Sequence, residues 1–145
     1  MIINKFVFKG DGSFGTGNYT DLLQILKKIE EDNPGEEIAE ILLLVPSKKN
    51  FDGTDISDIL NKIDPTFSKK LLKGAKIKIG RFSLELASGK LIPLTANIAI
   101  GWNISIKAID NLESNTNSNY IKSLYVKPWT ELEFNELRKR KYIEE

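Results

Sequence analysis

A nearly continuous apolar run at residues 38–45, Ile-Ala-Glu-Ile-Leu-Leu-Leu-Val, limits the folds that are open to this chain. A strand with one solvent-exposed face alternates apolar and polar residues, whereas a strand that is covered on both faces does not. Parallel sheets with helices on both sides provide that double cover. The run therefore predicts a central strand of an α/β fold.

The segment that precedes this run completes a strand–helix–strand unit. β-branched and aromatic residues at 2–8 predict a first strand. Apolar residues at helical spacing over 22–29 predict a helix, with Asn18 or Thr20 as its N-cap and a stop at 33–35.

The middle of the chain predicts two short helices followed by a hairpin. Apolar residues recur at helical spacing over 56–63, and a second short helix is expected over 65–72. Residues 76–86 then alternate, and a tight turn leads into a second strand over 91–100. We therefore expect an antiparallel hairpin insertion at about residues 76–100.

The last third returns to an alternation of helix and strand. The sequence predicts a helix over 104–112, a strand over 120–126 and a final helix that begins with a capping box of Thr130 and Glu133. No linker interrupts the pattern. We expect one three-layer, Rossmann-like α/β domain with a mostly parallel sheet across residues 1–145.

The composition excludes several kinds of chemistry. The chain contains no cysteine and no histidine, which removes disulfides, thiol nucleophiles, imidazole bases and the commonest zinc ligands. Its net charge is +1, with 21 basic and 20 acidic residues. Arginine, which most often recognises phosphate and guanine, occurs only at positions 81, 138 and 140. Charge and composition therefore argue against nucleic-acid binding.

The apolar segments are too short for a membrane protein. No run approaches the length of roughly 18 apolar residues that a membrane span needs. The first ten residues carry a lysine within a short apolar stretch and do not fit a signal peptide. We expect a cytoplasmic protein without a membrane partner.

A glycine-rich loop, Gly-Asp-Gly-Ser-Phe-Gly-Thr-Gly-Asn at residues 10–18, follows the first predicted strand. Gly10, Gly12 and Gly15 match the spacing G-x-G-x-x-G between a strand and a helix. Glycine allows the backbone to approach a ligand closely, and amides at the start of a helix bind phosphate. Over residues 2–45 the chain thus resembles Rossmann-like nucleotide-binding domains. The alternative is a turn that needs positive φ angles.

Ligands of open parallel sheets bind beyond the carboxyl ends of the strands. Four loops are expected there: the glycine-rich loop, 46–49, 101–103 and 127–130, and they contain both tryptophans. The candidate ligand-binding residues are Gly10, Gly12, Ser13, Gly15, Thr16, Gly17, Ser47, Lys48, Trp102, Asn103 and Trp129.

Several of these residues have a structural alternative. Trp102 and Trp129 either stack on a flat ligand or close the core where a helix packs on the sheet. Asn103 is also expected to cap the helix that follows it.

Three carboxylates lie in loops where they could bind magnesium or act as a base: Asp11, Asp52 and Asp55. Asp52 and Asp55 also fit a turn followed by a helix cap, with Thr54 or Asp55 as the cap. We favour the structural interpretation, and we predict no metal ligand.

Three functions fit these features. The first is a module that binds a nucleotide or another phosphorylated small molecule, with the backbone of residues 12–17 and Lys48 on the phosphate and a tryptophan on the flat part. The second is a protein-interaction or assembly subunit, bound to a protein partner or forming a homo-oligomer through the tryptophans and the basic helix end at 138–141. The third is a magnesium-dependent hydrolase that uses Asp11 and Asp52. The sequence identifies no cofactor and leaves open whether the protein is an enzyme.

Overall fold

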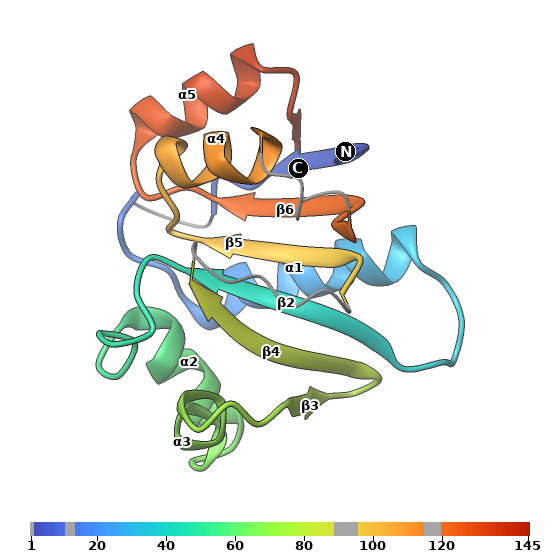
Figure 1. Ribbon diagram of the computed structural model, residues 1–145, viewed down its shortest axis with the longest axis vertical. Coiled ribbons are helices and arrows are strands. Elements are labelled where there is room, and N and C mark those ends of the chain that lie inside the picture. Colours follow the sequence, from blue (N-terminus) through green and yellow to red (C-terminus); the bar gives the residue numbers. More distant parts are fainter. Residues whose placement is uncertain (1, 11–13, 89–95, 115–119) are drawn as a thin grey trace.

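A computed structural model describes residues 2–10, 14–88, 96–114 and 120–145. Within these residues, seven strands form one sheet in the order β3-β4-β2-β5-β6-β1-β7. Figure 1 shows the strands side by side. The strands are β1 (Asn4–Val7), β2 (Ala39–Val45), β3 (Ile77–Ile79), β4 (Phe82–Ser88), β5 (Ile98–Trp102), β6 (Ser123–Lys127) and β7 (Ile143–Glu144). Neighbouring strands are parallel except for β3 and β4.

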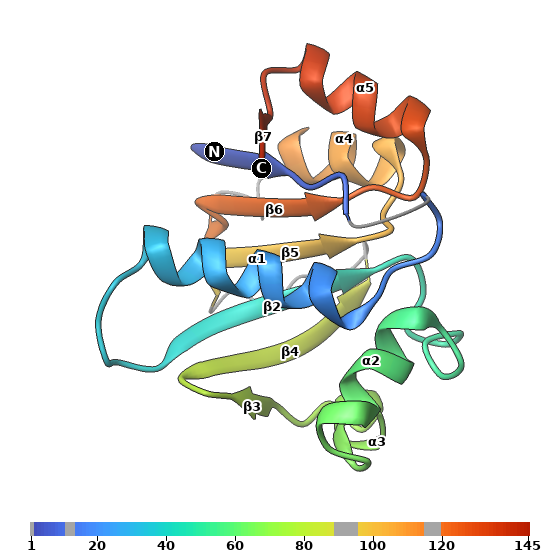
Figure 2. The same cartoon turned by 180° about the vertical axis from the view of Figure 1, so that it is seen from behind.

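Helices cover both faces of this sheet. They are α1 (Tyr19–Asp32), α2 (Asp55–Ile63), α3 (Phe67–Leu72), α4 (Ile106–Ser114) and α5 (Glu131–Lys139). Apolar side chains of α1, α2 and α3 pack on one face, and those of α4 and α5 pack on the other, as the two opposite views show (Figures 1 and 2). The predicted three-layer, Rossmann-like α/β fold is confirmed.

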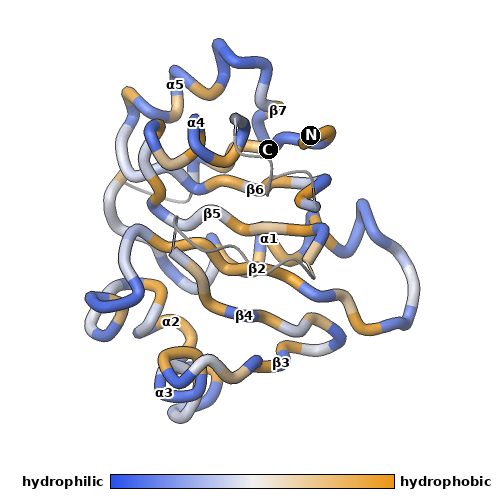
Figure 3. The backbone as a smooth tube through the Cα atoms, in the orientation of Figure 1, coloured by the Kyte–Doolittle hydropathy of each residue, from blue (hydrophilic) through white to orange (hydrophobic). Residues whose placement is uncertain are grey.

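The strand predicted from the apolar run is central and covered twice. Along β2, Ile41 and Leu43 belong to the core under α1, α2 and α3, whereas Leu42 and Leu44 belong to the core under α4 and α5. All four are at most 2% exposed. Figure 3 shows the apolar character of the middle strands. Burial of successive residues on opposite faces is the physical reason why the run does not alternate.

Local capping signals fix where three helices begin. Asn18 caps α1 and forms a capping box with Asp21. Thr54 caps α2 through its side chain, and Thr130 and Glu133 form the predicted capping box at the start of α5. In each case a side-chain oxygen accepts a hydrogen bond from a backbone N–H that the helix itself cannot satisfy.

The antiparallel pair exists, but it is smaller than predicted. It consists of β3 and β4, within residues 77–88. The strand expected over 91–100 exists in part as β5, but its predicted antiparallel pairing is wrong. β5 is parallel to both of its neighbours, β2 and β6. The predicted turn lies partly outside the described residues. An alternating pattern does not encode the direction of pairing, and β5 is buried along its whole length, as a central strand must be.

None of the described helices is long and apolar enough to cross a membrane.

Candidate functional site

The order of the strands opens a crevice at one edge of the sheet. β2 and β5 are neighbours and parallel, but α2 follows β2 onto one face while α4 follows β5 onto the other. The two chain segments therefore separate beyond the carboxyl ends of these strands, which is where open α/β sheets bind ligands. β6 and β1 form a second such point, because α5 and α1 also lie on opposite faces.

A partly buried polar cluster, which we call the Asp55 cluster, holds this edge together. Asp55 is the first residue of α2, and its carboxylate accepts hydrogen bonds from the backbone N–H groups of Gly17 and Ile56, both at 2.8 Å. It also accepts hydrogen bonds from Trp102 Nε1 at 3.1 Å and from Asn103 Nδ2 at 3.3 Å. One carboxylate thus joins the glycine-rich loop, the start of α2 and the end of β5.

Asn103 extends the cluster to the next strand. Its Nδ2 donates to Asp55, and its Oδ1 accepts a hydrogen bond from Lys127 Nζ at 3.2 Å. This orientation of the amide is the one that satisfies both a carboxylate and an ammonium group. Asn103 adopts a positive φ of 56°, a conformation that asparagine tolerates better than most residues. The predicted cap role is wrong, because Ser105 Oγ accepts from the Ala108 N–H at the start of α4.

Lys127, the last residue of β6, is 2% exposed. Its ammonium group lies 5.1 Å from the centre of the Trp102 ring, within the range of a cation–π contact. Burial lowers the pKa of Lys127 below its ordinary value, and the nearby Asp55 and Asp21 carboxylates oppose that shift. The cluster therefore surrounds a buried cation with an aromatic face, an amide oxygen and two carboxylates.

Gly17 is the glycine that the close packing of the cluster requires. A Cβ atom at this position would lie 2.4 Å from Trp102 Cζ2, 3.0 Å from Asp55 Oδ2 and 3.1 Å from Lys127 Cε. The first of these distances is shorter than a carbon atom tolerates and the other two are tight, so a side chain at this position would displace the loop from the indole ring. Because the Gly17 N–H donates to Asp55, it is not offered to a ligand.

A cavity of about 420 Å³ opens beside the cluster and has the size of a small-ligand site. Its wall includes the apolar side chains of Pro46, Phe51, Ile56 and the two tryptophans. Trp129 is half exposed, whereas Trp102 is 1% exposed and part of the core. Trp129 is thus the accessible indole of the two, while Trp102 fills a structural role.

A larger cavity of about 950 Å³ adjoins the first and shares part of its wall, including Ser47, Asn103 and Trp129. The larger cavity lies between the loop after β2 and the first turns of α4 and α5. The charged side chains among its described lining residues are Lys48, Lys49, Lys107 and Glu133.

The structure brings most of the predicted residues to this edge. Gly15, Thr16, Ser47, Trp102, Asn103 and Trp129 line the smaller cavity, and Lys48 lines the larger one. Gly17 belongs to the Asp55 cluster, and Gly10 adopts a positive φ with its Cα beside the Asp21 carboxylate. Gly12, Ser13 and Asp11 lie outside the described residues.

The sequence did not predict the roles of three residues of this edge. Lys127 lies in a predicted loop but is not among the predicted site residues, and Asp21 is in neither. Asp55 was predicted as a possible magnesium ligand or base, or as one of two alternative caps of α2; Thr54, the other alternative, is the cap. Two signals could have indicated Asp55 and Lys127. Asp55 is a carboxylate one residue after a threonine cap, and Lys127 is a lysine that ends an apolar strand.

Two further findings limit the chemistry. Among the described residues, no group of three acidic side chains is placed to hold a metal ion; Asp52 is exposed in the turn before α2. Within the same residues, every buried side-chain nitrogen or oxygen has a hydrogen-bond partner. The polar atoms of the Asp55 cluster are therefore used within the fold.

No protein-family model matches this chain, and no match was found among curated proteins or solved structures.

Proposed function

We propose that this protein is a small-molecule binding module, which holds a nucleotide or another phosphorylated small molecule at the carboxyl edge of its Rossmann-like sheet. The observation that carries the proposal is the pair of adjoining cavities beside β2 and β5, which share the half-exposed Trp129. Such folds generally bind ligands beyond the carboxyl ends of two neighbouring strands, where the helices that follow these strands lie on opposite faces of the sheet. Apolar walls with a few polar groups are typical of small-molecule sites.

A thermal-shift screen tests this proposal. The panel contains the four common ribonucleoside monophosphates, NAD, ribose 5-phosphate and glucose 6-phosphate. A ligand at a hundred times its dissociation constant adds about 2.7 kcal/mol to the free energy of unfolding, which raises the midpoint of a domain of this size by several degrees. We expect such a shift with at least one compound and a smaller shift in Trp129→Ala. A flat response across the panel contradicts the proposal.

A second function, a protein-interaction subunit, is favoured by one observation. Trp129 and Leu132 are 50% and 83% exposed at the start of α5, and an exposed tryptophan is typical of interface anchors. The basic end of α5 supports this function less, because Arg138 pairs with Glu144 and Arg140 pairs with Asp110. Light scattering tests the hypothesis: it predicts an oligomer that Leu132→Asp converts to a folded monomer, whereas a monomeric wild type contradicts self-association.

A further inference from the structure

We propose that the two cavities divide one ligand between them: the smaller cavity takes an uncharged planar ring, and the lysine-lined larger cavity takes its phosphate. The inference rests on the proposed function and deepens it, because it assigns the ligand to the class of nucleoside phosphates. It also moves the phosphate from the glycine-rich loop to Lys48, Lys49 and Lys107.

The smaller cavity suits an uncharged ring. Asp55 is the one charged residue among the described residues that line it, and its carboxylate already accepts the hydrogen bonds of the Asp55 cluster. A phosphate placed here would meet a negative charge in a partly buried site, which is unfavourable. A planar ring meets Pro46, Phe51 and the indole of Trp129 instead, and Thr16 and Asn50 add polar groups to the wall.

The larger cavity suits an anion. Lys48 and Lys49 come from the loop after β2, and Lys107 comes from the first turn of α4, so exposed lysines from two elements line this cavity. None of these lysines forms an ion pair with an acid in the described part of the chain. The Glu133 carboxylate is engaged in its capping box with Thr130. Three cations against one such carboxylate leave a positive wall, which complements phosphate.

The glycine-rich loop is the competing phosphate site, and carboxylates lie beside two of its described residues. A Cβ atom on Gly10 would lie 3.2 Å from Asp21 Oδ1, and the Gly17 N–H donates to Asp55. A phosphate that approached the backbone at Gly10 or Gly17 would therefore meet a carboxylate. Lys127 offsets part of this charge, but it is buried and held by Asn103. The phosphate therefore binds on the lysine side of Trp129.

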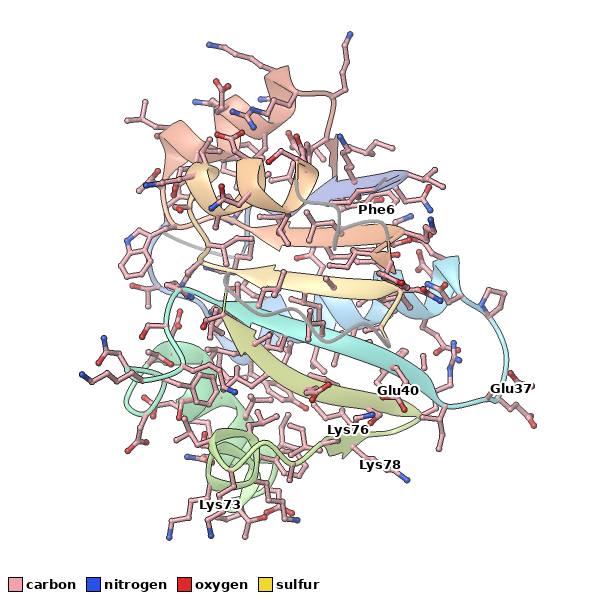
Figure 4. All side chains as sticks on the ribbon, in the orientation of Figure 1. Phe6, Glu37, Glu40, Lys73, Lys76 and Lys78 are labelled. Atoms are coloured by element: carbon pink, nitrogen blue, oxygen red, sulfur yellow. The ribbon has the colours of Figure 1, made fainter. Side chains whose placement is uncertain are left out.

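Isothermal titration calorimetry with separate probes for the two cavities tests the inference. The probes are the four common nucleosides, the corresponding monophosphates, ribose 5-phosphate and inorganic phosphate. The variants are Lys48→Ala/Lys107→Ala and Trp129→Ala. Lys73→Ala/Lys78→Ala is the matched control for charge, because Lys73 follows α3, Lys78 lies in β3, and neither lines either cavity (Figure 4). Tyr120→Ala is the control for a half-exposed aromatic residue, because Tyr120 precedes β6 at the opposite end of that strand.

The two variants have different expected signatures. The double lysine variant weakens binding of a nucleoside monophosphate about tenfold or more and leaves the nucleoside unchanged, because only the charged group is affected. Trp129→Ala weakens the nucleoside and its monophosphate by a similar factor of about ten, the usual scale for a stacked base, and leaves inorganic phosphate unchanged. Both controls bind like the wild type. Circular dichroism and thermal midpoints verify that every variant is folded.

The outcomes separate the inference from the proposed function. Monophosphate binding that both variants leave unchanged places the ligand elsewhere, and it overturns the inference while the proposed function stands. If ribose 5-phosphate binds but no nucleoside monophosphate does, the assignment to nucleoside phosphates is overturned, whereas the proposed function stands. Absence of binding for every probe, together with a flat thermal-shift panel, overturns both.

Discussion

Replacement of Asp55 by asparagine removes a charge from the centre of the Asp55 cluster without changing its shape. Oδ1 of Asp55 accepts from Ile56 N–H and Trp102 Nε1–H, and Oδ2 accepts from Gly17 N–H and the Asn103 amide. An asparagine offers one oxygen and one NH2 group. In either orientation the NH2 group faces two donors, which then lose their acceptor.

The expected cost follows from these lost hydrogen bonds. A partly buried donor without an acceptor costs about 1–3 kcal/mol, and two donors are affected. The change also removes one of the two carboxylates that stabilise the buried Lys127 ammonium. Because Asp55 is only partly buried, water compensates for part of the loss. We expect Asp55→Asn to lower the free energy of unfolding by about 2–4 kcal/mol.

Urea denaturation followed by circular dichroism measures this change. Asp58→Asn is the matched control, because Asp58 lies in the first turn of the same helix and is exposed. It loses only a favourable interaction with the helix dipole, about 0.3–1 kcal/mol. If Asp55→Asn were no more destabilising than Asp58→Asn, Asp55 would not be the residue that joins the three segments.

Two further predictions concern the same cluster. Gly17→Ala places a Cβ atom 2.4 Å from Trp102 Cζ2, so we expect a loss of about 1–3 kcal/mol in urea denaturation and a changed tryptophan signal in near-UV circular dichroism. Gly53→Ala, whose Cβ atom meets open space at a φ of +84°, is the control that leaves this signal unchanged; an unaltered signal in Gly17→Ala contradicts the close approach. The native pKa of Lys127 lies below its ordinary value of 10.5. Between these two values the unfolded chain binds more protons, so the free energy of unfolding rises with pH toward 10.5. The stability of the wild type relative to Lys127→Met should therefore increase in urea denaturation as the pH approaches 10.5 from below; a constant or falling difference contradicts the burial of the ammonium group.

The fold was predictable where local chemistry decides it. The run at 38–45 predicted a doubly covered strand because residues 41–45 within it are buried on one face or the other. Asn18 and the pair of Thr130 and Glu133 predicted helix starts because capping involves residues only three positions apart.

Strand pairing was not predictable in the same way. The alternation at 82–88 is compatible with either direction, and β4 and β5 both pair with β2 rather than with each other. The choice between a hairpin and two parallel neighbours depends on contacts with residues far away in the sequence. Such contacts leave no local pattern.

The candidate site was predictable as a place but not as a set of contacts. The four loops were expected at one edge because the strands that precede them were expected to be parallel, and β1, β2, β5 and β6 are parallel. Lys127, however, is buried only because Gly17 and Trp102 cover it. A lysine at the end of a strand ordinarily projects into water, so the sequence alone favoured the wrong environment.

The most direct test of the account is a ¹H–¹⁵N spectrum of the indole groups during titration with nucleoside monophosphates. The chain contains two tryptophans, so the spectrum contains two indole N–H signals that Trp129→Phe assigns. The account predicts a saturable shift of the Trp129 signal, which lies at the shared wall of both cavities, and a smaller shift of the Trp102 signal, whose N–H donates to Asp55. If neither signal moves at millimolar nucleotide, the edge does not bind this class of ligand and the account is contradicted.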